Sequence, residues 1–105
     1  MAIIRANTGV ITQINVFTVP ERGQQALIDL LIEAATACRD VPGWMSASLH
    51  RSLDGTRVVN YAQVRDHASL EKVMERLKAG NFLERNKALG TAHPGLYEVA
   101  YTLDK

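Results

Sequence analysis

The feature of the sequence that most constrains its fold is the order in which two spacings of apolar residues occur, that of a strand and that of a helix. Residues 10–19 (VITQINVFTV) are rich in β-branched side chains and are predicted to form a strand, which Pro20 ends. Residues 24–41 then repeat apolar side chains at the spacing of a helix. The stripe consists of Leu27, Leu30, Leu31, Ala34, Cys38 and Val41. The pattern therefore indicates a strand followed by an amphipathic helix.

The remaining elements follow from the same spacings. After a Pro-Gly pair that breaks the helix, residues 44–52 and 57–65 are predicted as two strands of a hairpin. Asp66 is the expected N-cap of a second helix, and Gly80 is its expected C-cap. The inward stripe of this helix is Leu70, Val73, Met74 and Leu77.

A shorter helix and one more strand complete the chain. Asn81 is expected to cap the short helix, which reaches Leu89, and residues 96–103 are predicted as the last strand. The order strand, helix, strand, strand, helix, short helix, strand is that of the ferredoxin-like split βαβ arrangement. We therefore predict one α+β domain over residues 1–105, with a four-stranded antiparallel sheet. Two helices cover one face of such a sheet, so a homodimer is expected to cover the other.

Composition excludes several classes of partner. Twelve Lys and Arg against eleven Asp and Glu leave a formal charge of +1, without a basic run that would bind nucleic acid. No apolar stretch is long enough for a membrane helix and no signal peptide is recognised, which predicts a soluble, cytoplasmic protein. Cys38 is the only cysteine and is expected in the core, and no histidines and carboxylates have the spacing of a metal site. His67 and His93 are expected at the surface.

The hairpin allows two registers, and each brings different side chains together. A two-residue turn would place Leu49 opposite Asn60, whereas a three-residue loop that starts at Leu53 would place Ser48 opposite Asn60. We prefer the second, because it separates a polar face from an apolar face. The polar face then carries Trp44, Ser46, Ser48, His50, Val58, Asn60, Ala62 and Val64. The apolar face carries Met45, Ala47, Leu49, Val59 and Tyr61, and is assigned to the subunit interface.

The first strand adds two amides, Gln13 and Asn15, to the polar face by the same alternation. Buried amides and hydroxyls need hydrogen-bond partners, so this face either lines a cavity or is hydrated. In a purely structural alternative, the polar groups form hydrogen bonds to one another or to water. Trp44 begins this face and is expected to form part of the wall of a pocket.

The segment Pro42–Val64 (PGWMSASLHRSLDGTRVVNYAQV) resembles the central hairpin of the antibiotic-biosynthesis monooxygenase family. It is most similar to the enzymes that oxidise tricyclic aromatic polyketides in actinorhodin-type pathways. The shared features are the DGT turn, the VVNYAQ strand and the histidine before the turn. The order of elements agrees with the family over residues 8–104.

The resemblance implies a homodimeric α+β barrel, with a pocket between the sheet and the helices of each subunit. It also implies oxygenation of an electron-rich phenolic substrate by dioxygen, without metal, flavin or haem. Asn60 matches the family's pocket asparagine, whose amide would polarise a substrate carbonyl or enolate oxygen. His50 matches its histidine and would accept or relay a proton, since histidine exchanges protons near neutral pH.

Some positions depart from the family pattern. Val64 stands where the family commonly carries a pocket tryptophan, and Leu70 where it carries a tyrosine, which predicts a less aromatic and more open pocket. Arg85 is expected to supply the family's helix arginine, with Glu84 as the competing residue. Haem-degrading relatives use a tryptophan and a haem-ligating histidine where this chain has Val64 and Asn86, so haem degradation is not expected.

Two functions follow. The first is a cofactor-independent monooxygenase that oxidises a quinol, an anthrone or a related small aromatic, with Asn60 and His50 as catalytic residues. The residues expected to bind the substrate are Asn15, Trp44, Ser48, Val64, Leu70 and Arg85. The alternative, which the missing tryptophan and tyrosine favour, is a non-catalytic dimeric barrel that binds a small molecule or acts as an accessory subunit.

Overall fold

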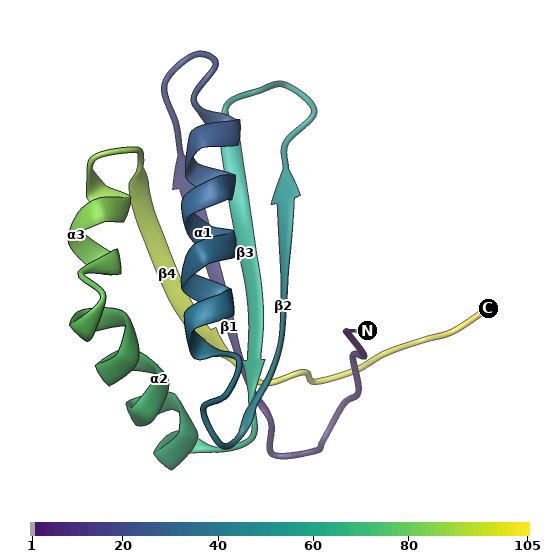
Figure 1. Ribbon diagram of the computed structural model, residues 1–105. Helices are drawn as coiled ribbons and strands as arrows, with labels where there is room; N and C mark the ends of the chain where they lie inside the picture. Colours follow the sequence, from purple (N-terminus) through teal and green to yellow (C-terminus); the bar gives the residue numbers. More distant parts are fainter. Residues whose placement is uncertain (1) are drawn as a thin grey trace.

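The computed structural model describes residues 2–105 and contains four strands and three helices in that part of the chain. The strands are β1 (Ile11–Thr18), β2 (Trp44–Arg51), β3 (Arg57–Val64) and β4 (Thr91–Tyr97), and the helices are α1 (Gln24–Cys38), α2 (His67–Ala79) and α3 (Phe82–Lys87). The strands form one antiparallel sheet in the order β2-β3-β1-β4. Helices α1 and α2 pack against one face of it (Figure 1). The predicted α+β, ferredoxin-like arrangement is confirmed.

Helix α1 ends at Cys38, earlier than the spacing predicted. Beyond it the chain closes tighter turns, in which the N–H of Arg39 donates to the carbonyl of Thr36 and that of Val41 to the carbonyl of Cys38. The following Pro42 also disfavours helical backbone at the residue before it. The apolar stripe itself is buried as expected, and Val41 is only 4% exposed in the turn. The predicted stripe is therefore correct and the predicted boundary is wrong.

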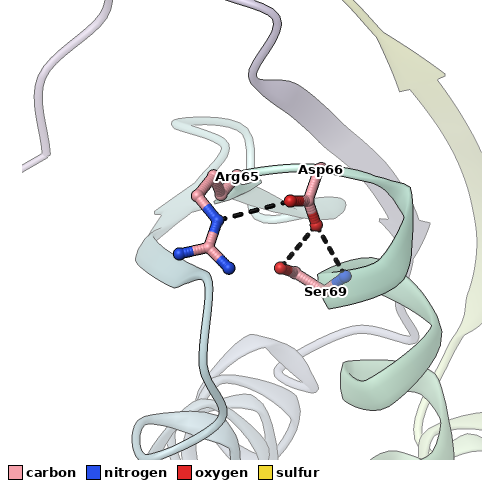
Figure 2. A network of polar contacts seen from close by, with 3 residues as sticks. All are labelled: Arg65, Asp66 and Ser69. Carbon is pink, nitrogen blue, oxygen red and sulfur yellow. Dashed lines mark hydrogen bonds and ion pairs between the residues drawn. The ribbon is translucent and has the colours of Figure 1, made fainter.

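The start of α2 is joined closely to the start of β2. Gly43 has a φ of +87°, and a Cβ atom there would lie 1.8 Å from the hydroxyl of Ser69, so the position requires glycine. Figure 2 shows Asp66 as the N-cap of α2, accepting hydrogen bonds from the Ser69 backbone N–H at 2.8 Å and from its hydroxyl at 2.7 Å. Arg65 lies 3.3 Å from the same carboxylate. The predicted cap is confirmed, and these hydrogen bonds lower the pKa of Asp66 to about 2.

The β2–β3 hairpin takes the register that we did not prefer. Leu49, and not Ser48, lies opposite Asn60. Five residues, 52–56, connect the strands, and the first of them, Ser52, donates its N–H to the carbonyl of Arg57 at 3.0 Å. Asn60 therefore shares a face with Leu49, while Ser48 and the residues that alternate with it lie on the opposite face.

Side-chain hydrogen bonds in the loop account for this register. The Asp54 carboxylate accepts from the Ser52 hydroxyl at 2.8 Å, from the Thr56 hydroxyl at 2.7 Å and from the Thr56 N–H at 3.0 Å. They hold a wider loop than the three-residue one that we expected. A bulge between Trp44 and Ser46 shifts the register at the other end of β2, so that Trp44 stays on the same face as Leu49.

Strand β4 covers Thr91–Tyr97, whereas residues 96–103 were predicted as the last strand. The strand contains Pro94 and Gly95, two residue types that usually interrupt strands. Both are tolerated because β4 is an edge strand, bonded on one side only, to β1. His93, which was expected in a loop before the last strand, lies within β4.

The buried core lies between the helices and one face of the sheet. It is formed by three clusters, centred on Phe17 with Leu27, on Cys38 with Val64, and on Leu30 with Phe82. The opposite face carries no helix of the described chain (Figure 1). None of the helices within residues 2–105 combines the length and apolar character that crossing a membrane requires.

Candidate active site

Asn60 is the polar side chain that most clearly marks a site. It lies in the middle of β3, opposite Asn15 of β1 and Leu49 of β2, on the face that the helices cover. Its side-chain oxygen Oδ1 is buried and has no hydrogen-bond partner within residues 2–105. A buried acceptor without a partner costs stability, so its retention needs an explanation.

A small cavity of about 50 Å³ borders Asn60, between the sheet and helices α1 and α2. It is lined by Gln13, Leu31, Ala34, Ala35, Cys38, Trp44, Ala47, Asn60, Ala62, Val73 and Leu77. The volume is that of one or two molecules as small as water, whose share of liquid volume is about 30 Å³. This cavity alone therefore admits dioxygen and excludes an aromatic ring system.

A larger groove of about 510 Å³ runs between α2 and β4. Its walls are Gln13, Leu70, Met74, Pro94, Gly95 and Leu96. This volume falls in the range of sites for drug-sized ligands, roughly 300–1,000 Å³. Gln13 borders both spaces, so the groove and the cavity at Asn60 are neighbours on the same face of the sheet.

The walls of the cavity and the groove are uncharged. Cys38 is their one titratable side chain in the described chain, and burial raises the pKa of its thiol, so that it stays protonated at neutral pH. Cys38 is 2% exposed and packs with Val41, Val64 and Val73, as expected of a core residue. Amides are the main polar groups that can contact a bound molecule here, because Gln13 and Asn60 line the cavity.

His50 and Ser48 lie on the opposite face of the sheet from Asn60, so the predicted polar face is wrong. Both are on the face of the sheet that the helices leave open, because they alternate with Leu49. The Ser48 hydroxyl lies 3.0 Å from His50 Nε2, and His50 is exposed. Ala47 and Leu49, which were assigned to the subunit interface, turn towards the helices instead.

Three of the residues expected to bind substrate have other contacts. Asn15 is on the face of Asn60, but its side-chain oxygen accepts a hydrogen bond from the backbone N–H of His93 at 3.1 Å. Val64 is 5% exposed and belongs to the core, and it does not border the cavity at Asn60. Arg85 is partly exposed on α3 and pairs with Glu33 of α1 at 2.8 Å.

Trp44 and Leu70, which were also expected to bind substrate, lie in the walls of the cavity and of the groove. Trp44 borders the cavity at Asn60, and Leu70 borders the groove. The competing residue to Arg85, Glu84, pairs with Lys87 on the surface of α3. Neither Arg85 nor Glu84 lines the cavity or the groove.

Two residues of interest were not named as site residues from the sequence. Gln13 borders both the cavity and the groove, and its alternation with Asn15 had already placed it on this face of the sheet. Asn86, on α3, also has a buried side-chain oxygen without a partner within residues 2–105, which no sequence pattern signals. In the same range, no group of three or more His, Cys, Asp or Glu side chains is placed to hold a metal ion.

This fold is shared with monooxygenases of antibiotic biosynthesis. SnoaB from Streptomyces nogalater, a cofactor-independent oxygenase, has a TM-score of 0.81 and 23% sequence identity, over 92% of this chain and 99% of that one. A monooxygenase from the gene ActVA-Orf6 of Streptomyces coelicolor, solved with nanaomycin D, has a TM-score of 0.79 and 24% identity, over 90% and 91% of the two chains. At these identities the likeness shows a common fold.

Sequence similarity points in the same direction. The chain is 42% identical over 69 residues to the tetracenomycin-F1 monooxygenase of Streptomyces glaucescens, a match that covers 65% of this chain and 62% of that protein. The matched segment thus spans about three fifths of the curated relative. No protein-family model matches the chain. The comparisons confirm the resemblance to the antibiotic-biosynthesis monooxygenases, in fold over nearly the whole chain and in sequence over these 69 residues.

Proposed function

We propose that this protein is a cofactor-independent monooxygenase that oxidises a small aromatic quinol or anthrone with dioxygen. The observation that carries the proposal is the buried, unpartnered amide oxygen of Asn60, which borders a cavity on the helix-covered face of the sheet. The similarity to a tetracenomycin-F1 monooxygenase and to a cofactor-independent oxygenase supports this reaction class. Catalysis of this kind needs a site that binds and orients the substrate and stabilises its anion.

The groove and the cavity match the aromatic substrate and dioxygen in size. A flat aromatic substrate fits the groove between Leu70 and Met74 of α2 and Leu96 of β4. Its inner edge then meets Gln13 and, beyond it, the cavity at Asn60, which has room for dioxygen. A bound ring would displace water from the apolar walls, which strengthens the hydrogen bonds made at this end.

The chemistry balances with substrate and dioxygen alone. The deprotonated aromatic transfers an electron to dioxygen, and the two join through a new C–O bond to give a peroxide. For an anthrone, the O–O bond then breaks, one oxygen becomes the carbonyl of the product, and the other leaves as water with the two methylene hydrogens. The four electrons gained by dioxygen come from the substrate carbon, so the protein supplies none.

Asn60 can serve this reaction with either end of its amide. The oxygen accepts a hydrogen bond from a phenolic hydroxyl of the substrate, and a half-turn of the amide offers the NH₂ group to an enolate oxygen. A donor aimed at a developing negative charge in a dry site typically accelerates a reaction by roughly 100- to 1,000-fold.

Replacing Asn60 by Ala tests the proposal. We expect metal-free wild-type protein to consume oxygen with quinols or anthrones, and Asn60→Ala to lower turnover by roughly 10- to 1,000-fold. The matched control is Ser48→Ala, which removes a polar group from the opposite face of the neighbouring strand and should leave turnover unchanged. Equal turnover in Asn60→Ala, measured with an oxygen electrode on folded protein, would reject the assignment of the site.

The uncharged walls favour one alternative. A site without an acid or base suits a barrel that binds a small aromatic without converting it, or that acts as an accessory subunit. In that case the protein would bind quinols, as titration calorimetry would show, without any oxygen uptake. Turnover with even one quinol or anthrone of the panel excludes this alternative.

We further propose that the protein is a cytoplasmic homodimer of one-domain subunits. The open face of the sheet supports the dimer, because it carries the half-buried side chains of Ile14, Val16, Val59 and Tyr61 and no helix or strand of the described chain packs on it. A second copy laid on this face would bury them. The composition of this face differs from the predicted one, since Ala47 and Leu49 turn inward.

A further inference from the structure

Gln13 lies where the cavity and the groove of the candidate site meet. It is on β1, an inner strand of the sheet, opposite Ala62 of β3 on one side and Leu96 of β4 on the other. Ala62 lines the cavity and Leu96 lines the groove, while Gln13 is half-buried and lines both. The inner edge of a flat molecule in the groove therefore meets Gln13 before it reaches the cavity.

Helix α2 borders both spaces with apolar side chains. Val73 and Leu77 line the cavity, and Leu70 and Met74 line the groove. None of these four side chains offers a good hydrogen-bond donor or acceptor. A polar substituent at the inner edge of a bound ring consequently has to find its hydrogen bond on the sheet side.

The amides of the sheet differ in their access to the groove. Asn15 lines neither space, and its side-chain oxygen already accepts a hydrogen bond from the backbone N–H of His93 at 3.1 Å. Asn60 lines the cavity but not the groove. Gln13 is therefore the amide that a ring in the groove meets first.

A glutamine amide can bond to either kind of ring oxygen. Its NH₂ group donates to a carbonyl or phenolate oxygen, and its own oxygen accepts from a hydroxyl. Between apolar walls, a buried polar group that is left without a partner weakens binding. One well-placed amide can therefore discriminate between rings that carry an oxygen at this edge and rings that do not.

We propose that Gln13 is a specificity-determining residue, whose amide binds an oxygen at the inner edge of the aromatic substrate and selects rings that carry one. This inference rests on the proposed function, which supplies the aromatic substrate of the groove. The hydrogen bond also orients the ring, because the edge held by Gln13 is the edge nearest to the cavity at Asn60. Gln13 thus contributes to binding, whereas Asn60 acts on the charge that develops during the reaction.

Two unreactive rings of nearly equal shape test the selection without turnover. Fluorenone and fluorene are flat tricyclic compounds that differ in one carbonyl oxygen. The fluorescence of Trp44, the only tryptophan of the chain and part of the cavity wall, reports their binding to the full-length protein. The wild type should bind fluorenone more tightly than fluorene.

Gln13→Leu keeps most of the side-chain bulk and removes the amide. It should reduce the preference for fluorenone, measured as the ratio of the two dissociation constants, by roughly 5- to 30-fold, because the carbonyl of the ring is then left unpaired. Gln13→Met, an unbranched apolar variant of similar length, should give the same result. Circular dichroism checks that each variant keeps the fold.

Gln63→Leu is the matched control. Gln63 is on the neighbouring strand β3, but its amide donates to the hydroxyl of Thr12 at 3.2 Å, and its side chain lies on the open face of the sheet. Removing this amide should leave the preference for fluorenone unchanged.

Kinetics with an anthrone separate the role of Gln13 from that of Asn60. Gln13→Leu should raise KM by a similar factor, roughly 5- to 30-fold, with little change in kcat, whereas Asn60→Ala should lower kcat. A selective loss of binding is not expected if Gln13 only packs in the sheet, because fluorenone and fluorene have nearly the same shape.

The outcomes distinguish this inference from the proposed function. An unchanged ratio of dissociation constants in Gln13→Leu and Gln13→Met would overturn the inference, even if the wild type is an active oxygenase. A wild type that binds neither ring, or binds both equally, would also overturn it. If the wild type shows the expected preference, and Gln13→Leu reduces it, but no quinol or anthrone leads to oxygen uptake, then the oxygenase is rejected and Gln13 remains the selecting residue.

Discussion

At the scale of single residues, the chain keeps polar groups where apolar ones would be more stable. Asn60 and Asn86 each bury an oxygen without a partner within residues 2–105, and such an atom typically costs about 1–3 kcal/mol. Natural proteins commonly accept such a cost at functional sites, where the group is satisfied by a ligand. A ligand of Asn60 could occupy the neighbouring cavity. Asn86, in contrast, borders neither the cavity nor the groove.

The burial of Val64 changes the expected effect of a substitution at this position. The family resemblance places a tryptophan here, and on sequence alone Val64→Trp would restore an aromatic pocket wall. In the structure Val64 is packed among Cys38, Val41 and Val73. We therefore expect Val64→Trp to overpack the core and to lower the free energy of unfolding by about 1–3 kcal/mol or more. Urea denaturation followed by circular dichroism measures this change.

Leu70→Trp is the matched control for Val64→Trp. Leu70 is half-buried at the wall of the groove, so a larger side chain there can extend into open space. The variant should remain close to the wild type in stability while reducing the affinity for wide ring systems. If the two tryptophan variants were equally stable, the packing around Val64 would be looser than the structure shows.

At the scale of elements, local patterns predicted the helices better than the sheet. The stripe of α1 and the Asp66 cap of α2 follow from neighbours in sequence, and both are confirmed. β4 was placed too late, because Pro94 and Gly95 are acceptable only at a sheet edge, and no local pattern shows which strand becomes an edge. The largely exposed residues 98–103, which follow β4, supplied the apolar alternation that was taken for the last strand.

The hairpin register had the largest consequence for the site. Two registers were compatible with the sequence, and the choice was decided by hydrogen bonds among Ser52, Asp54 and Thr56 that propensities do not reveal. A shift of one residue between paired strands moves every side chain of one of them to the other face. As a result, Asn60 borders the cavity on the helix-covered face, whereas His50 and Ser48 lie on the opposite face and not beside Asn60 as predicted.

The N-terminus of α2 gives a pH-dependent stability that can be tested. The pKa of Asp66 is lowered to about 2 from its ordinary 3.8, mainly by the hydrogen bond from the Ser69 hydroxyl. A carboxylate with a lowered pKa stabilises the fold above its ordinary pKa, and this contribution is lost as the pH falls towards 2. Asp66→Asn keeps a capping oxygen but no charge, so it should be less stable than wild type above about pH 4.

Thermal unfolding between pH 7 and pH 2 measures this effect. The difference in Tm between wild type and Asp66→Asn should be largest above pH 4 and should shrink towards pH 2. Asp54, whose pKa is also lowered to about 2, titrates in the same window in both proteins and serves as the internal reference. A gap in Tm that stayed constant down to pH 2 would mean that the carboxylate charge of Asp66 does not contribute.

At the scale of the whole molecule, the histidine side chains lie away from the candidate site. His50 and His93 are exposed on the open side of the sheet, and His67 is exposed at the start of α2. The cavity and the groove are lined by amides and apolar groups, with the Cys38 thiol held protonated. Under the proposed function, the protein supplies orientation and hydrogen bonds, and the substrate loses its proton by its own acidity.

This separation predicts how the rate depends on pH. For each substrate, kcat/KM should rise with pH around the ionisation of that substrate, because no side chain in the site acts as the base. Two anthrones or quinols that differ in acidity through a remote electron-withdrawing group should therefore give midpoints that differ as their own pKa values do. His50→Gln should change neither midpoint, since His50 is on the opposite face of the sheet. Stopped-flow oxygen consumption over a pH series measures both profiles, and one midpoint common to both substrates would instead require a base in the protein.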